Sequence, residues 1–183
     1  MRGVDDAALA RRAAAGDAAA FGELVSRLGP AVRRVARVIL DDPDDADDAA
    51  QEGFLAAWRA LDRFDPARPF EPWLMRIVVN AARDLRRRRG VRATVTIAPE
   101  LPSDGPRPDQ AAGDALLRDR LRSALARLPE RQRLAVTLFD AEGWSHAEIA
   151  ELVELPEGTV RSDLHQARRA LRTALGGLWK EQA

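Results

Sequence analysis

Four residues at helical spacing form a row that could bind a nucleic acid. The row stands in an apolar, helix-like run and consists of Arg76, Asn80, Arg83 and Arg87. Arginines at this spacing can neutralise phosphates, and an asparagine among them can both donate to and accept from a base edge. Arginines also suit the negative end of a helix dipole. Four consecutive arginines, residues 86–89, exceed what a helix end needs, so we interpret the row as a nucleic-acid surface.

An acidic run, residues 41–52, precedes this row by about thirty positions and opens another predicted helix. Its first aspartates suit a helix N-terminus. Farther along, one outward face combines acids, an amide and an apolar side chain: Asp48, Gln51, Glu52 and Leu55. An exposed leucine among acidic and amide side chains indicates a protein-docking face. A metal-dependent nuclease also uses clustered aspartates, but adjacent aspartates at a helix start do not converge on one ion.

A second basic face is predicted near the C-terminus, in residues 144–171. A short helix, a turn and a longer helix follow one another there, as in a helix-turn-helix that reads the DNA major groove. The longer helix has a predicted buried stripe of Val160, Leu164, Ala167 and Leu171, and an opposite stripe of Arg161, His165, Arg168 and Arg172. An ordinary helical hairpin with a solvated basic face is the alternative.

Two residues of this segment argue against DNA binding. Glu154 stands in the turn, where a left-handed backbone favours glycine and another residue costs ~1 kcal/mol. Asp163 places a negative charge on the helix that would approach phosphate.

The elements that position these residues are predicted to be helices throughout. Alanine, leucine, arginine and glutamate dominate the 183-residue chain, and tyrosine is absent. Residues 97–110 contain four prolines, which predict an extended linker. We therefore expect an all-α protein with two small helical domains, residues 1–90 and 112–183, joined by a flexible linker at 91–111. Expected helices in the first domain are 6–15, 18–40, 45–61 and 72–89, and those in the second are 114–128, 129–142, a short helix from 145 and 158–175.

Composition excludes several classes of protein. The chain has no cysteine, hence no disulfide or thiolate metal site, and its two histidines lack a supporting ligand pattern, so we expect no metal and no cofactor. No apolar run approaches the ~20 residues that span a bilayer, and the charged N-terminus does not look like a signal peptide. We expect a cytoplasmic protein without membrane insertion. The formal net charge of zero says less about partners than the separation of the charges does.

Three segments together resemble the extracytoplasmic-function (ECF) sigma factors of bacterial RNA polymerase. They are residues 44–61 (DDADDAAQEGFLAAWRAL), residues 70–89 (FEPWLMRIVVNAARDLRRRR) and residues 128–171, which include LPERQRLAV and GTVRSDLHQARRAL. The resemblance covers nearly the whole chain as a sigma-2 domain, a linker and a sigma-4 domain. It implies a binding protein and not an enzyme. The implied partners are core RNA polymerase (the beta-prime clamp and the beta flap), promoter DNA and an anti-sigma factor.

The resemblance also implies roles for individual residues. Asp48, Gln51, Glu52 and Leu55 would dock on the polymerase clamp. The loop 65–71 would hold a base extruded from the minus-ten element. Minus-ten contacts would come from Asp65, Arg68, Phe70, Arg76, Asn80, Arg83 and Arg87, with Asp84 orienting neighbouring arginines. Minus-thirty-five contacts would come from Glu157, Thr159, Arg161, Ser162, His165 and Arg168.

The chain departs from the family pattern at three positions. Asp163 replaces a common basic residue and could favour a cytosine edge. Glu154 replaces the glycine of the turn, and Gly53 replaces a better helix former, at ~1 kcal/mol in propensity. Two other functions stay open: a stand-alone helix-turn-helix regulator that never binds polymerase, and a helical adaptor that mimics sigma and sequesters an anti-sigma factor.

Overall fold

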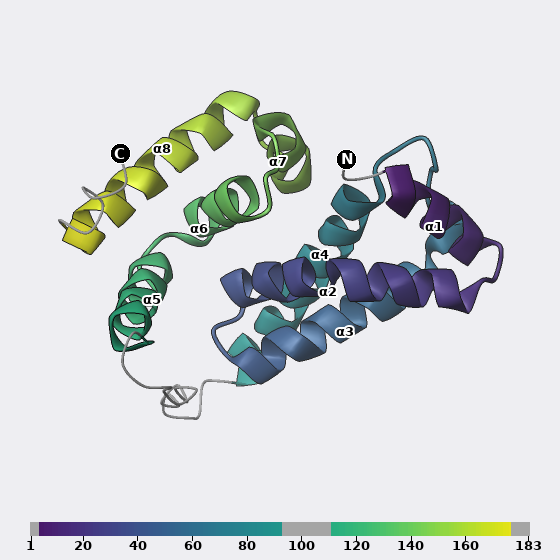
Figure 1. Ribbon diagram of the computed structural model, residues 1–183, viewed down its shortest axis with the longest axis horizontal. Helices are drawn as coiled ribbons and strands as arrows, with labels where there is room; N and C mark the ends of the chain where they lie inside the picture. Colours follow the sequence, from purple (N-terminus) through teal and green to yellow (C-terminus); the bar gives the residue numbers. More distant parts are fainter. Residues whose placement is uncertain (1–3, 93–110, 177–183) are drawn as a thin grey trace. The chain divides into compact units, whose positions relative to one another are not determined.

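The computed structural model describes residues 4–92 and 111–176 (Figure 1). These residues form helices joined by short turns, and no strand occurs among them. The chain divides into two compact units, Met1–Thr96 and Ile97–Ala183. The all-α fold class is therefore confirmed. The linker predicted at 91–111 lies almost entirely outside the described residues.

The first unit is a four-helix assembly. Its helices are α1 (Val4–Ala14), α2 (Ala18–Ile39), α3 (Pro43–Arg59) and α4 (Phe70–Arg92), with a 3-10 turn, η1 (Leu61–Arg63), after α3. Helices α2, α3 and α4 pack against one another in pairs, and α1 covers α2. Aliphatic side chains without solvent exposure fill the centre, among them Leu24, Val32, Val35, Leu74, Met75 and Val78.

Aspartates cap two of these helices. The Asp17 carboxylate accepts a hydrogen bond from the Ala20 backbone N–H at the start of α2 (3.1 Å). Asp42 likewise accepts from the N–H groups of Asp44 and Asp45, and Pro43 follows it at the first helical position. Helix α3 thus starts two residues earlier than the predicted 45, because proline is favourable in a first turn where its missing N–H is not needed.

Gly53 lets α3 approach α4 closely. A Cβ at this position would lie 2.7 Å from Val78 Cγ2 and 3.3 Å from Val78 Cα. Both distances are shorter than ordinary carbon contacts. Glycine at this position lowers the helix propensity of α3, as the sequence indicated, but its missing side chain allows the two helices to pack this closely.

Aromatic rings brace the start of α4. Phe64, Phe70 and Trp73 contact one another, with ring centroids 5.1 to 5.4 Å apart. Helix α4 begins at Phe70 and not at the predicted residue 72, because the Phe70 ring is held in this buried cluster with 1% of its surface exposed. The residues between Phe64 and Phe70 form an exposed loop.

The second unit is also helical. It comprises α5 (Ala111–Ala126), α6 (Glu130–Val136), a π-helical turn η3 (Thr137–Ala141), α7 (His146–Val153) and α8 (Glu157–Leu175). The single helix predicted at 129–142 is thus an α-helix that ends in a π turn. The spacing of Ser145 and Glu148 in the sequence is that of a capping box, and the two residues form one at the start of α7.

The turn between α7 and α8 has the left-handed backbone that the sequence suggested. Glu154 ends α7 at φ 57°, ψ 43°, and is the one non-glycine residue with positive φ in the described ranges. The predicted apolar stripe of α8 is also confirmed, since Val160, Leu164, Ala167 and Leu171 are all buried. The α7–α8 pair is therefore a helix-turn-helix in its local geometry.

Candidate protein-docking and nucleic-acid interfaces

The predicted docking residues lie together on the exposed side of α3. Asp48, Gln51, Glu52 and Leu55 are all exposed, Leu55 to 47%. Their neighbours Phe54 and Ala57 turn inward and hold the helix in the bundle. We call these four exposed residues the α3 face.

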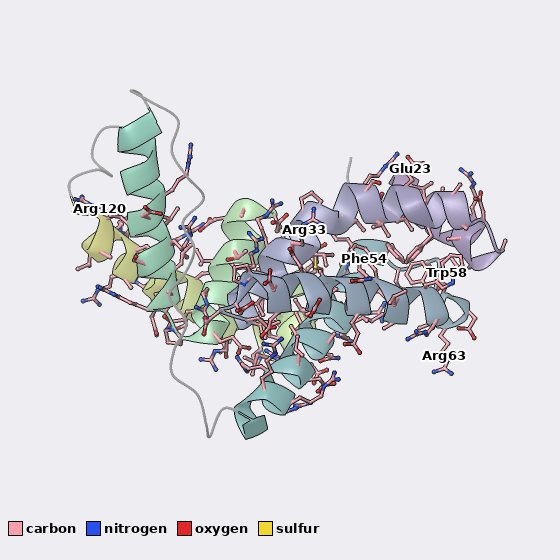
Figure 2. The ribbon with its side chains drawn as sticks, turned by 90° about the horizontal axis from the view of Figure 1, so that it is seen from below. Glu23, Arg33, Phe54, Trp58, Arg63 and Arg120 are labelled. Atoms are coloured by element: carbon pink, nitrogen blue, oxygen red, sulfur yellow. The ribbon has the colours of Figure 1, made fainter. Side chains whose placement is uncertain are left out.

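Helical spacing predicts Trp58 on the core side of α3, together with Phe54 and Ala57, but the structure places it partly at the surface. Its side chain is 38% exposed, although it contacts Phe21 of α2 with ring centroids 4.9 Å apart. Figure 2 shows Phe54 and Trp58 along α3, with Arg63 projecting away from the bundle beyond the end of the helix. The apolar part of the surface beside Leu55 is thus larger than the sequence suggested.

The acidic and basic runs are partly paired with each other. Arg89 forms an ion pair with Asp45, which is buried, and Arg88 Nη2 lies 3.8 Å from an exposed Glu52 oxygen. Burial raises the pKa of Asp45 above its ordinary value, while the nearby Arg89 acts in the opposite direction. Two of the four consecutive arginines therefore contact α3, and the opening expectation that all four exceed structural needs is too broad.

The row on α4 is only partly open to solvent. Asn80 and Arg87 are exposed, whereas Arg76 and Arg83 are half-buried. Arg87 pairs with Asp84, one turn before it. Helical spacing predicts an apolar side of α4 made of Trp73, Leu74, Ile77, Val78, Ala81 and Leu85, but Met75, Val79 and Ala82 are buried while Ile77, Ala81 and Leu85 are half-buried. Helix α4 packs against α2, α3 and, less extensively, α1, and its buried side is rotated relative to the predicted one.

The loop before α4 has a defined turn. Asp65 Oδ1 accepts from the Ala67 N–H (2.9 Å), and the Asp65 carbonyl accepts from the Arg68 N–H (3.0 Å). Both Asp65 and Arg68 are exposed. Phe70, predicted to contact minus-ten DNA, is buried in the aromatic cluster instead. Its ring packs beneath the loop against Phe64 and Trp73 and is not exposed to solvent.

The predicted outer stripe of α8 is confirmed as exposed. Its members Arg161, His165, Arg168 and Arg172 are all exposed, as is Ser162, whereas Glu157 and Thr159 are half-buried. Two of the arginines already hold carboxylates of this chain. Arg161 Nη2 donates to Glu157 Oε1 (2.5 Å), and Arg168 donates through Nε to Asp140 Oδ2 (3.1 Å) and through Nη2 to Oδ1. The hydrogen bond with Asp140 raises the pKa of Arg168 above its ordinary value.

Asp163 does not lie on the outer face, which corrects the expectation that it would approach DNA. Its side chain is 3% exposed and pairs with Arg131 of α6, with Arg131 Nε 2.5 Å from Asp163 Oδ2. The neighbouring pair Gln132–Gln166 joins the same two helices at 2.8 Å. Asp163 therefore fastens α8 to α6 and has no access to a cytosine edge.

Sequence reasoning missed the residues that support α8 from α6 and η3. Arg131, Phe139 and Asp140 precede their α8 partners by 28 residues or more, a separation for which no local pattern exists. Only the LPERQR segment, with an arginine shortly after the proline, offers a faint sequence signal. Among the described side chains, no group of acids and histidines could hold a metal ion. No described helix is long and apolar enough to cross a membrane.

Comparison with known proteins identifies the family. The chain matches Sigma-70 region 2 over residues 24–92 and Sigma-70, region 4 over residues 118–171. It is 41% identical to the RNA polymerase sigma factor NccH of Alcaligenes xylosoxydans xylosoxydans, over 93% of this chain and 94% of that one. The chain belongs to the sigma-70 family of RNA polymerase sigma factors. Further relatives above 35% identity carry the name ECF RNA polymerase sigma factor, which places it in the ECF group.

Solved structures agree with this assignment. The structure of CnrH in complex with the cytosolic domain of CnrY has a TM-score of 0.70 and 33% identity, and the match covers 98% of this chain and 99% of CnrH. The sigma factor RpoE of Bartonella quintana, solved with the anti-sigma factor NepR, has a TM-score of 0.69 at 25% identity over 89% and 98% of the two chains. This ECF sigma factor therefore has a role in transcription initiation and belongs to a class of regulatory proteins, not enzymes.

Proposed function

We propose that this ECF sigma factor binds core RNA polymerase through the α3 face and directs initiation at promoters that carry minus-ten and minus-thirty-five elements. The observation that carries the proposal is the exposure of two chemically different surfaces on one small unit: the α3 face with Leu55, and the α4 row with Asn80. The polymerase performs nucleotide transfer, and the sigma factor selects the site.

In this proposal the loop between Phe64 and Phe70 captures a base from the minus-ten element. The turn closed by Asp65 and the buried aromatic cluster hold the loop in one shape before DNA arrives. Extrusion of a base costs a few kcal/mol, which contacts in a preformed loop offset. Asp65 and Arg68 supply the exposed polar groups, and Asn80 with the α4 arginines meets the adjoining duplex.

Helix α8 would read the minus-thirty-five element through Arg161, Ser162, His165 and Arg168, with Glu157 and Thr159 at its N-terminal end. Weak contacts in each unit suffice because tethering raises the effective concentration of the second contact. An anti-sigma factor is a proposed inhibitor, because RpoE was solved with the anti-sigma factor NepR. The beta-prime clamp and the beta flap are the proposed polymerase sites.

Transcription with purified components tests this function. The chain is mixed with bacterial core polymerase and a pool of promoter fragments, and the run-off products are sequenced. We expect transcripts from a defined subset of fragments that share two spaced elements. Absence of transcripts that depend on the chain would refute the proposal.

Two variants separate the two surfaces. Leu55→Arg should abolish association with core polymerase, because it replaces the one apolar side chain of the α3 face with a positive charge. Asn80→Ala should weaken promoter opening and leave core binding intact. Arg63→Ala is the matched control, since Arg63 is exposed and lies outside both surfaces (Figure 2). If Asn80→Ala lost core binding as well, the assigned roles would be wrong.

The two alternative functions predict different results. A stand-alone regulator would bind a specific duplex tightly without polymerase and would be indifferent to Leu55→Arg. A sigma-mimicking adaptor would bind an anti-sigma factor and leave core polymerase inactive on every promoter. The same purified components decide among the three.

A further inference from the structure

Arg168, one of the proposed minus-thirty-five residues, is held from one side by the π turn that precedes α7. Asp140 accepts hydrogen bonds from its Nε and Nη2, and the Arg168 Cζ lies 5.0 Å from the centroid of the Phe139 ring. Phe139 in turn stacks near His146, with ring centroids 4.6 Å apart. Both Arg168 and Asp140 are exposed, at side-chain exposures of 44% and 41%. The pair thus lies at the surface of the proposed reading face.

The geometry of this pair leaves half of the guanidinium for DNA. A guanidinium has five N–H groups. Asp140 takes Nε–H and one hydrogen of Nη2, so the edge formed by Nη1 and the other Nη2 hydrogen is not engaged by it. That edge matches a pair of acceptors, such as O6 and N7 of guanine in the major groove.

The charge of the pair has a different consequence. Affinity for any DNA depends on the number of cations that neutralise phosphates. Because Asp140 cancels the charge of Arg168 at the reading face, Arg168 adds little to attraction for DNA of arbitrary sequence. Its hydrogen-bonding edge still depends on the correct acceptors.

We propose that Asp140 is a specificity-determining residue: it cancels the charge of Arg168 toward phosphates and fixes its guanidinium so that Arg168 reads a paired acceptor on the minus-thirty-five duplex. Asp140 acts through Arg168 and is a positioning residue. The part of the inference that concerns reading of the promoter rests on the proposed function. The part that concerns the charge of Arg168 can be tested on the isolated chain.

The first test measures binding of the full chain to a duplex of random sequence by fluorescence anisotropy at a series of salt concentrations. Asp140→Asn should bind more tightly than the wild type and steepen the slope of log affinity against log salt by about 0.9, the value for one added phosphate contact. Between about 50 and 200 mM salt, the ratio of the two affinities should then change about 3.5-fold. Asp140→Ser should behave in the same way, and circular dichroism checks that both variants are folded.

Asp119→Asn is the matched control. Asp119 pairs with Arg122 at 2.9 Å on the exposed surface of α5, so the substitution makes the same change of charge at an ion pair that does not include Arg168. It should leave the slope unchanged. A slope change equal to that of Asp140→Asn would show a general effect of charge and overturn the inference.

The second test measures discrimination by the holoenzyme, between the promoter selected in the run-off experiment and the same fragment with a scrambled minus-thirty-five element. Asp140→Asn should lower this ratio. The double variant Asp140→Asn with Arg168→Gln is neutral like the wild-type pair, so it should restore the wild-type salt slope without restoring discrimination. Unchanged discrimination in both variants would overturn the role in reading. If the wild type initiated nowhere, the proposed function would fail, and the salt slope would still decide whether Asp140 cancels Arg168.

Discussion

Gly53 offers a sharp test of how closely α3 and α4 pack. In an isolated helix, Gly53→Ala should be favourable by ~1 kcal/mol, because alanine is the better helix former. In this unit the new Cβ would meet Val78 Cγ2 at 2.7 Å and Val78 Cα at 3.3 Å. Val78 is fully buried and β-branched, so its methyl group cannot easily rotate away within a helix.

The expected net effect follows from two opposing magnitudes. Added volume in a close-packed core costs ~1–3 kcal/mol. With a contact this short on a stiff side chain, we expect ~2 kcal/mol from packing, less the ~1 kcal/mol gained in propensity. Gly53→Ala should therefore destabilise the first unit by ~1 kcal/mol, which corresponds to about fivefold faster hydrogen exchange at protected amides that open with the whole unit.

Hydrogen exchange on the full chain measures this effect within each unit. Amides of α3 and α4 should exchange faster, while those of α8 serve as an internal control. Gly22→Ala is the matched variant, since an added Cβ on α2 would meet nothing within 4 Å, and it should stabilise the same unit. Val78→Ala alone should also destabilise this unit, and the double variant Gly53→Ala with Val78→Ala should lose ~1 kcal/mol less than the sum of the two single variants, because the short contact is absent from it. Stabilisation by Gly53→Ala equal to that of Gly22→Ala would refute the close contact.

Three further predictions concern caps and buried charge. Glu154→Gly should raise the stability of the second unit by up to ~1 kcal/mol in thermal unfolding, because glycine adopts the left-handed backbone without steric cost; an unchanged melting temperature would contradict this. Arg131→Ala should destabilise that unit by ~2 kcal/mol in urea unfolding, because it leaves the buried Asp163 carboxylate without its partner. The double variant Arg131→Met with Asp163→Leu should recover most of this loss. Equal losses of stability in the single and double variants would argue against the ion pair. The hydrogen bond from the Ala20 N–H and the contact with Arg12 lower the pKa of Asp17, so the contribution of Asp17 to stability is complete above the unfolded pKa and disappears as pH falls through the folded pKa. In melting temperatures measured against pH, Asp17→Ala should flatten the fall at acid pH, and Asp17→Asn should flatten it while keeping the cap. An unaltered fall at acid pH would refute the assignment.

Local sequence patterns predicted the helices and several of their ends. The capping box at Ser145, the apolar stripe of α8 and the exposure of the α3 face follow from spacings of three or four residues, which a helix converts directly into one side. The left-handed turn at Glu154 was also expected, because the backbone of a helix-turn-helix is often left-handed at this point of the turn. For such features, the neighbours that matter lie within one or two turns of chain.

Features that depend on distant residues were decided only by the tertiary structure. Asp163 reads as a surface charge until Arg131 of another helix meets it in the interior. In the sequence, Gly53 is only a poor helix former, and its role becomes clear from its close approach to Val78 of α4. Phe70 is predicted in a loop, whereas the structure packs it against the rings of Phe64 and Trp73. Arg168 was predicted correctly to be exposed, but its carboxylate partner stands 28 residues away. The amino-acid sequence by itself determined which side of each helix is apolar or charged, because that depends on helical periodicity. Which charges remain for a partner was decided by packing, because ion pairs and close contacts form between residues that only the folded chain brings together.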